Sequence, residues 1–187
     1  MDVHCCPGPA GARQRGFTLA EALVTVALGA LVLTLGVPSL QTLIQHNRLA
    51  ATVNHFVGAL QYARSAAVRR VQHVVLCPSR DHARCADIQD WSDGWIVYVD
   101  LNHDRDRDPH EPLLRTGAPL AGGITLHSSR GRRRIRYEAL GYSRGTNASF
   151  TFCDTRHRAA PRVICLSNTG RPRLLKTACG GKPPDCP

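Results

Sequence analysis

The sequence lacks the combinations of side chains from which most enzyme sites and zinc sites are built. It has eight cysteines but no C-x-x-C pair, and the irregular cysteine spacing is unlike that of structural zinc sites. None of the nine histidines forms a recognisable motif with a cysteine nucleophile, and no constellation of acid, base and nucleophile stands out. These absences predict a protein that is not an enzyme and needs neither a metal nor a cofactor.

Acidic side chains are missing from a long C-terminal stretch. Between Arg156 and Lys182 there are seven Lys or Arg and no Asp or Glu. Residues 112–187 hold 14 basic and three acidic side chains, whereas residues 77–111 hold four basic and nine acidic ones. The strongly basic C-terminal part of the chain favours a polyanionic partner, either nucleic acid or an anionic surface. The alternative is a solvated basic face that only keeps the protein soluble.

Charge is also nearly absent from residues 17–37, where Glu21 is the only charged side chain. As a helix this run would be roughly 31 Å long, about the thickness of the hydrocarbon core of a bilayer. No A-x-A site follows it, which argues against an ordinary secretory signal. Because Arg13 and Arg15 precede the run, the positive-inside rule places residues 1–16 in the cytoplasm and predicts that everything after the span is exported.

The carboxylate of Glu21 needs a functional reason, since an unpaired charge inside a membrane is costly. The hexapeptide GFTLAE, residues 16–21, resembles the processing motif of type IV pilins and type II secretion pseudopilins. The resemblance implies that a prepilin peptidase cuts after Gly16 and methylates the new N-terminal Phe17. It also implies that Glu21 guides assembly by pairing with the amino group of a neighbouring subunit. Pro38 lies where these proteins commonly carry a helix-bending proline. The alternative is a plain membrane anchor.

The pattern beyond Pro38 changes from a continuous apolar run to an amphipathic helix and then to short strands. One helix is predicted from about residue 18 to 72, bent near Gly36–Pro38, with a membrane-spanning part over 17–38 and an amphipathic part over 39–72. Its apolar residues recur at three- and four-residue steps and should pack on a sheet: Val53, Phe56, Val57, Leu60, Ala63, Ala67 and Val71.

After residue 72, β-branched and aromatic runs alternate with turn residues, which predicts six to eight short antiparallel strands. The runs cover residues 73–77, 95–99, 122–127, 134–138, 149–153 and 162–166. The expected fold class is therefore α+β, with a long N-terminal helix packed on a globular antiparallel β head over 73–187. This agrees with the resemblance to pilins, which combine one long helix with a β head.

Six cysteines lie beyond the expected leader, and an even number in an exported domain favours disulfides. We expect sequential pairing, although six cysteines allow many connectivities. The expected bonds are Cys77–Cys85, Cys153–Cys165 and Cys179–Cys186.

The segment DLNHDRDRDPHE, residues 100–111, resembles a calcium-binding EF-hand loop in the spacing of its oxygen-bearing side chains. However, Arg105 takes the place of the glycine that such a loop needs for its sharp turn, and Arg107 adds further positive charge. We therefore favour a polar hairpin loop between two strands, with bound calcium as the alternative.

The exported part is similar to the FimT/GspH group of minor pilins and pseudopilins, in which DGWIVYVD, an Asp/Asn-rich loop and EPLLR form a typical stretch. FimT-like pilins of natural transformation bind DNA through a G-R-x-R motif near the C-terminus. Here the motif is matched by GRPR, which contains Gly170, Arg171 and Arg173. The resemblance implies that these residues bind DNA, and neighbouring basic side chains would widen the patch: Arg158, Arg162 and Lys176.

Two arginines at this spacing suit a phosphate backbone. In an extended segment Arg171 and Arg173 would project to the same side, roughly 6.6 Å apart, and guanidinium groups make two-pronged contacts to phosphate oxygens. Such contacts position a duplex without reading its sequence. Since the patch has few aromatic residues, a preference for single strands is not expected.

The predicted function is that of a minor type IV pilin, held in the bacterial inner membrane, whose periplasmic head binds double-stranded DNA for uptake in natural transformation. Its expected partners are DNA, other pilins or pseudopilins, and prepilin peptidase. Two alternatives involve no DNA, namely a pseudopilin of a type II secretion system and a minor pilin that only primes pilus assembly. The role of the arginine-rich stretch 130–136 stays open.

Overall fold

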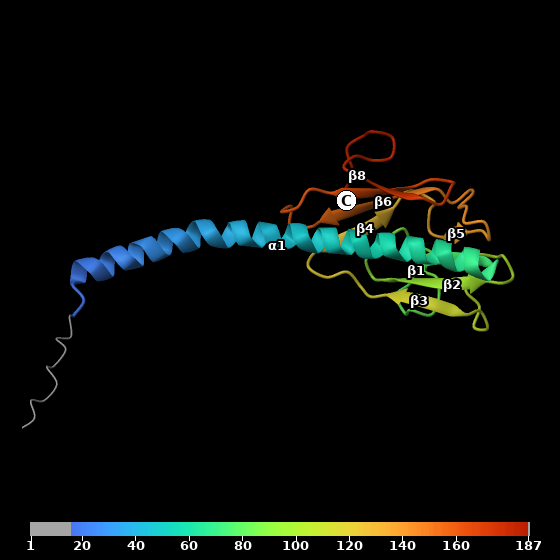
Figure 1. The fold of residues 1–187 in the computed structure, drawn as a ribbon, viewed down its shortest axis with the longest axis horizontal. Helices are drawn as coiled ribbons and strands as arrows, with labels where there is room; N and C mark the ends of the chain where they lie inside the picture. The colour runs from blue at the N-terminus through green and yellow to red at the C-terminus, as the bar shows by residue number, and fades with distance from the viewer. Residues whose placement is uncertain (1–15, 187) are drawn as a thin grey trace, which may run out of the picture. The chain divides into compact units, whose positions relative to one another are not determined.

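The computed structural model describes residues 16–186, which form one long helix and two antiparallel sheets (Figure 1). Its contacts divide it into an N-terminal unit that ends at Leu40 and a head that begins at Gln41. The helix α1 (Leu19–Arg70) belongs to both units and contains Pro38. The expected leader, residues 1–16, lies outside the described residues except for Gly16. The expected bend near Gly36–Pro38 stays a prediction.

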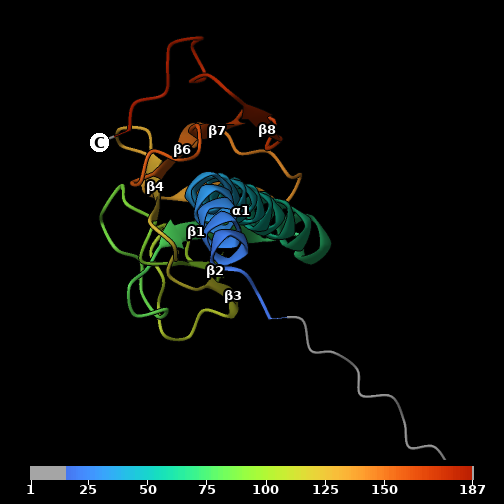
Figure 2. The same ribbon diagram turned by 90° about the vertical axis from the view of Figure 1, so that its left-hand side faces the viewer.

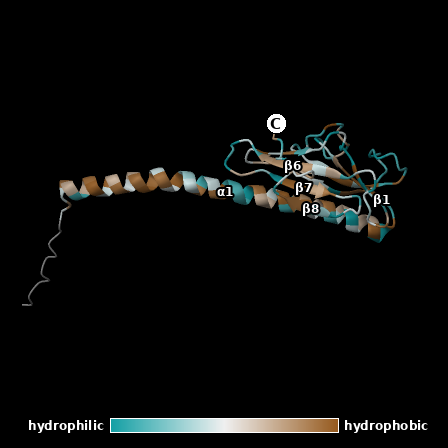
Figure 3. Cartoon of the chain, turned by 90° about the horizontal axis from the view of Figure 1, so that it is seen from above, coloured by the Kyte–Doolittle hydropathy of each residue, from teal (hydrophilic) through white to brown (hydrophobic). Residues whose placement is uncertain are grey.

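Every residue from Phe17 to Leu40 is exposed, including the N-terminal part of α1. Figure 3 shows this part of the helix with mostly hydrophobic residues, coloured brown. Thr18 caps the helix, because its Oγ1 accepts a hydrogen bond from the backbone N–H of Glu21 at 3.2 Å. By length and composition this helix can cross a membrane, as the sequence predicted.

Sheet A has the strand order β3-β2-β1-β5, and every neighbouring pair is antiparallel. Its strands are β1 (His73–Pro78), β2 (Trp95–Asp100), β3 (Leu113–Gly117) and β5 (Ile135–Tyr137). The sequence predicted β1, β2 and β5 from their β-branched and aromatic runs. It indicated β3 only indirectly, as the strand after the hairpin loop 100–111, because this edge strand is only partly buried.

Sheet B has the order β4-β6-β7-β8, again antiparallel throughout. Its strands are β4 (Ile124–Ser128), β6 (Ala148–Asp154), β7 (Arg162–Leu166) and β8 (Pro172–Leu175). Three of them match predicted strands, whereas β8 was not predicted. It is an edge strand that begins with Pro172 and buries none of its residues completely, so its sequence resembles a loop.

Within the head, α1 packs against the inner faces of both sheets, with sheet B on one side and sheet A on the other (Figure 2). Phe56 lies at the centre of this core. Its ring makes edge contacts with Phe150 and Trp91, with centroid distances of 4.8 and 5.7 Å. The expected apolar face of the helix is confirmed for most of its members, but Val57 is only partly buried. Val71 is exposed, because the helix ends at Arg70.

Asp154, at the end of β6, ties sheet B to the helix. The Nε2 atom of Gln45 donates to its carboxylate at 2.7 Å, and the backbone N–H groups of three residues in the following loop donate to it as well: Arg156, Arg158 and Ala159. Burial opposes ionisation of Asp154, but these hydrogen bonds outweigh it and hold the pKa of the carboxyl below its usual value.

Two of the three expected disulfides, Cys153–Cys165 and Cys179–Cys186, are wrong. Cys77–Cys85 forms as expected, whereas the other bonds are Cys153–Cys186 and Cys165–Cys179. The expected Cys153–Cys165 bond is wrong because of the register between β6 and β7. In that register Cys165 lies opposite Ser149, four residues along β6 from Cys153. The two disulfides instead fasten the C-terminal segment to β6 and β7.

Candidate nucleic-acid interface

The glycine of the GRPR motif is required by the backbone. Gly170 closes the turn after β7, has a φ of 74°, and donates its N–H to the carbonyl oxygen of Ser167 at 2.9 Å. A Cβ atom here would collide with the carbonyl oxygen of Gly141. Gly170 is buried, so it makes no surface contact of its own. Its role is to place the arginines that follow.

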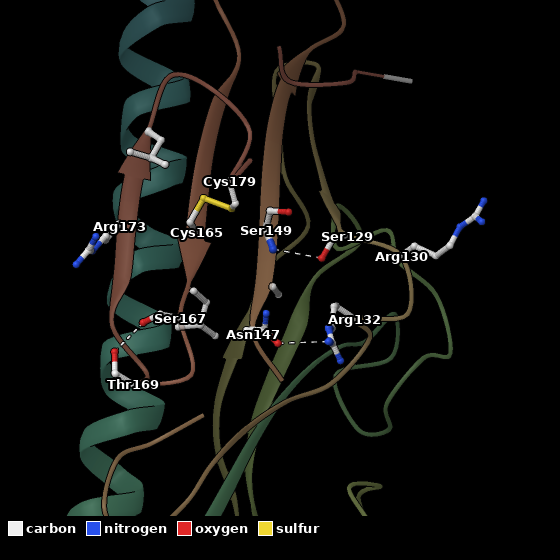
Figure 4. A pocket seen from close by; sticks show the side chains of 13 residues that line it. Ser129, Arg130, Arg132, Asn147, Ser149, Cys165, Ser167, Thr169, Arg173 and Cys179 are labelled. Carbon is white, nitrogen blue, oxygen red and sulfur yellow. Dashed lines mark hydrogen bonds between the residues drawn. A yellow bond between two sulfur atoms is a disulfide. The ribbon is translucent and has the colours of Figure 1, made fainter. Parts of the chain in front are cut away.

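Arg173 lies on β8 at the side of a cleft on the outer face of sheet B (Figure 4). In the sheet register Arg173 lies opposite Cys165, which in turn lies opposite Ser149. Arg130 and Arg132 lie on the loop at the other side of the cleft. The cleft has a volume of about 680 Å³. Hydroxyl and amide side chains line much of the space between: Ser129, Asn147, Ser149, Ser167 and Thr169.

Arg171 lies in a different place from Arg173. It lines a groove of about 630 Å³ next to α1, together with Arg64, Arg69 and Pro172. The expectation that Arg171 and Arg173 project to the same side is therefore wrong, since Arg171 lines the groove and Arg173 lines the cleft. The turn at Gly170 explains the difference, because β8 begins only at Pro172 and the strand alternation does not extend back to Arg171.

The other expected site residues lie towards the far end of β8. Val163 pairs with Leu175, so Arg162 and Lys176 flank the last register pair of β7 and β8. Lys176 and Arg158 are exposed, whereas Arg162 is half-buried. Of these basic residues only Arg173 lies on edge strand β8, whereas Arg171 directly precedes the strand and Lys176 directly follows it. Sequence reasoning missed Arg64 and Arg69 because they lie on the helix, about 100 residues before the motif.

The arginine-rich stretch 130–136 has two different roles. Arg133 and Arg134 form ion pairs with Asp87, and Arg134 also pairs with Asp106 at 3.2 Å. Arg136 approaches Glu138 at 3.9 Å. Arg133 and Arg134 thus hold the start of β5 to the acidic segment, residues 77–111. Arg130 and Arg132 instead line the cleft beside Arg173, with Arg132 also hydrogen-bonded to the carbonyl oxygen of Gly145.

The loop that resembles an EF-hand is held together by its own side chains. Glu111 is buried and accepts hydrogen bonds from the backbone N–H groups of Leu101 and Asp108 at 2.7 and 3.0 Å. The amide nitrogen of Asn102 donates to both Asp104 and Asp108 at 2.9 Å. Across residues 16–186, no three or more His, Cys, Asp or Glu side chains are arranged to hold a metal ion.

The fold and the N-terminus together define a pilin-like protein, with an apolar N-terminal helix that continues into a small β head. Comparison with protein families identifies the family within this class. The model of the type II transport protein GspH family matches residues 52–170, and that of the prokaryotic N-terminal methylation motif matches residues 11–37. The chain therefore belongs to the GspH family of type IV pilin-like proteins. Members of this family are structural proteins rather than enzymes, and membership implies processing by prepilin peptidase and association with other pilins.

Crystal structures of the minor pilin FimU show the same fold. The type IV minor pilin FimU of Pseudomonas aeruginosa shares 22% sequence identity with this chain. Its crystal structure matches with a TM-score of 0.57, and the match covers 70% of this chain and 90% of FimU. A second crystal form of FimU is 21% identical, with a TM-score of 0.52 over 67% and 91%. The minor pseudopilin EpsH of Vibrio cholerae is 12% identical, with a TM-score of 0.49 over 68% and 96%. No curated protein sequence matched the chain.

Proposed function

We propose that this protein is a minor type IV pilin whose head binds double-stranded DNA, without sequence specificity, during natural transformation. The observation that carries the proposal is the state of the two motif arginines. Arg171 and Arg173 are both exposed, and neither takes part in an ion pair among the residues that the structure describes. Arg133 and Arg134, in contrast, form ion pairs with Asp87.

The cleft beside Arg173 has the chemistry of a phosphate-binding surface. Arginine, hydroxyl and amide side chains supply most contacts to phosphate oxygens in protein–DNA interfaces, and all three kinds line this cleft. Its 13 lining residues include neither an acidic nor an aromatic side chain. The cleft therefore favours contacts to the backbone over stacking of unpaired bases.

We place the protein in the bacterial inner membrane, with residues 17–38 as the span and the head in the periplasm. Cleavage after Gly16, methylation of Phe17 and pairing of Glu21 with a neighbouring subunit are part of the same proposal. The exposed apolar part of α1 supports it. So does the match of residues 11–37 to the N-terminal methylation motif.

The test is a titration of duplex DNA into the untagged full chain, inserted into nanodiscs of zwitterionic lipid so that the membrane carries no net charge. Binding is followed by fluorescence anisotropy across salt concentrations. For duplex DNA the log–log salt slope is about −0.9 per phosphate contact, so Arg171→Ala/Arg173→Ala should flatten it by roughly 1.8. The matched control is Arg80→Ala/Arg84→Ala, which removes two exposed arginines from the acidic segment and should leave the slope unchanged.

Two results would contradict the proposal. If the wild-type chain fails to bind at low salt, DNA is not its partner. If both double variants flatten the slope equally, only net charge matters and the motif is not a site.

A second candidate is a pseudopilin of a type II secretion system, which the description of the matching family as a type II transport protein also fits. In that role the basic edge strand would contact other pseudopilins, and the wild-type chain would not bind DNA.

A further inference from the structure

The groove next to α1 gathers three arginines from two distant parts of the chain. Arg64 and Arg69 come from the last turns of the helix, and Arg171 comes from the segment that leads into β8. The remaining lining residues carry no charge: Gln61, Ser65, Val68 and Pro172. Three guanidinium groups with no acidic neighbour in the lining make this groove a second basic surface, separate from the cleft that holds Arg173.

The groove is held in shape by a single carbonyl group. The Nε atom of Arg64 donates to the carbonyl oxygen of Gly141 at 3.0 Å. The turn that ends at Gly170 packs against the same oxygen. Gly141 thus fixes the helix and the motif turn against each other, so Arg64 and Arg171 are already placed together in the protein alone. Such preorganisation lowers the entropic cost of binding a ligand.

We infer that this groove binds the phosphate backbone of duplex DNA, with Arg64 and Arg69 as contacts in addition to Arg171. The inference rests on the proposed DNA-binding function and extends its site from the C-terminal motif to the helix. Edge strand β8 then lies between two phosphate-binding sites, namely the groove that contains Arg171 and the cleft that contains Arg173. The motif would then contribute Arg171 to the groove and Arg173 to the cleft, which gives a function to the different directions of the two side chains.

The decisive variant is Arg69→Ala, because Arg69 is exposed and ends in the groove, so its loss should leave the fold intact. The matched control is Arg70→Ala, which removes the same charge from the next position of the helix but does not line the groove. With the full chain in zwitterionic nanodiscs and duplex DNA as the probe, Arg69→Ala should flatten the log–log salt slope by about 0.9. Arg70→Ala should leave it unchanged. The double variant Arg64→Gln/Arg69→Ala should flatten it by roughly 1.8.

The outcomes separate this inference from the proposed function. If Arg69→Ala and Arg70→Ala behave alike while Arg173→Ala still flattens the slope, the protein binds DNA but the groove takes no part. If the wild-type chain does not bind DNA, both proposals fall. If Arg69→Ala changes only self-association in sedimentation velocity, the groove is a contact between subunits and the inference is wrong. The thermal unfolding of each variant, measured alongside, identifies any change that comes from misfolding.

Discussion

Gly170 illustrates, at the scale of a single residue, how a motif position can serve a site without touching the ligand. The residue is buried, has a positive φ and packs against the carbonyl oxygen of Gly141. Any side chain here would both strain the backbone and displace the turn. Because Arg171 follows directly, the direction of its side chain depends on this glycine.

We predict that Gly170→Ala destabilises the head and weakens DNA binding. A left-handed conformation costs a non-glycine residue roughly 1–2 kcal/mol, and the collision with Gly141 adds to that cost. Gly145→Ala is the matched control, since Gly145 has a similar φ of 68° but open space around its Cα. Urea denaturation of both variants should show the larger loss for Gly170→Ala. Equal losses would mean that only the backbone strain counts.

The Cys165–Cys179 disulfide acts at the scale of the element, because it links β7 to the segment that follows β8. This strand pairs only with β7, is mostly exposed, and lies between Cys165 and Cys179 in the chain. The Cys165–Cys179 bond closes a short loop around β8 and holds it to its neighbour. The strand that carries Arg173 therefore depends on a covalent link more than on burial.

We predict that Cys165→Ser/Cys179→Ser frees β8 and removes the contribution of Arg173 to DNA binding. Loss of a disulfide that closes a loop of this size costs about 3 kcal/mol. In the double variant, the further change Arg173→Ala should no longer flatten the salt slope. Removing the Cys77–Cys85 bond instead should lower stability but keep the effect of Arg173→Ala. An undiminished effect in the Cys165/Cys179 variant would show that strand pairing alone holds β8.

At the scale of the whole molecule, opposite charges are sorted into parts with different roles. The acidic segment 77–111 neutralises Arg133 and Arg134 through Asp87 and Asp106. The arginines that line the groove next to α1 and the cleft beside Arg173 take part in no ion pair among the described residues. The net charge of +10 is unevenly distributed along the chain, since residues 112–187 hold 14 basic and three acidic side chains.

Glu21, in the N-terminal unit, bears on how the whole molecule assembles in its host membrane. We expect Glu21→Leu to be cleaved after Gly16 and methylated on Phe17 as in the wild type, since the cleavage site itself is intact. Its incorporation into filaments should fall sharply, because the variant lacks the carboxylate that we propose pairs with the amino group of a neighbouring subunit. Mass spectrometry of the membrane fraction checks processing, and immunoblotting of sheared filaments checks incorporation. Normal incorporation would overturn the assigned role of Glu21.

The long apolar helix, the α+β class and the family could all be predicted from the sequence. These features depend on local patterns: the run over 17–37, the GFTLAE hexapeptide and the β-branched and aromatic runs that became β1, β2 and β6. Each pattern is strong because the residues that carry it are neighbours in the chain.

The pairing of the cysteines, the edge strand β8 and the composition of the candidate site follow from the tertiary structure alone. Cys153 and Cys165 are near in sequence, but strand register keeps them apart and brings the C-terminal cysteines to them instead. Arg64 and Arg69 join Arg171 although they lie about 100 residues earlier in the chain. Register and packing between distant segments set these contacts, and no short stretch of sequence records them.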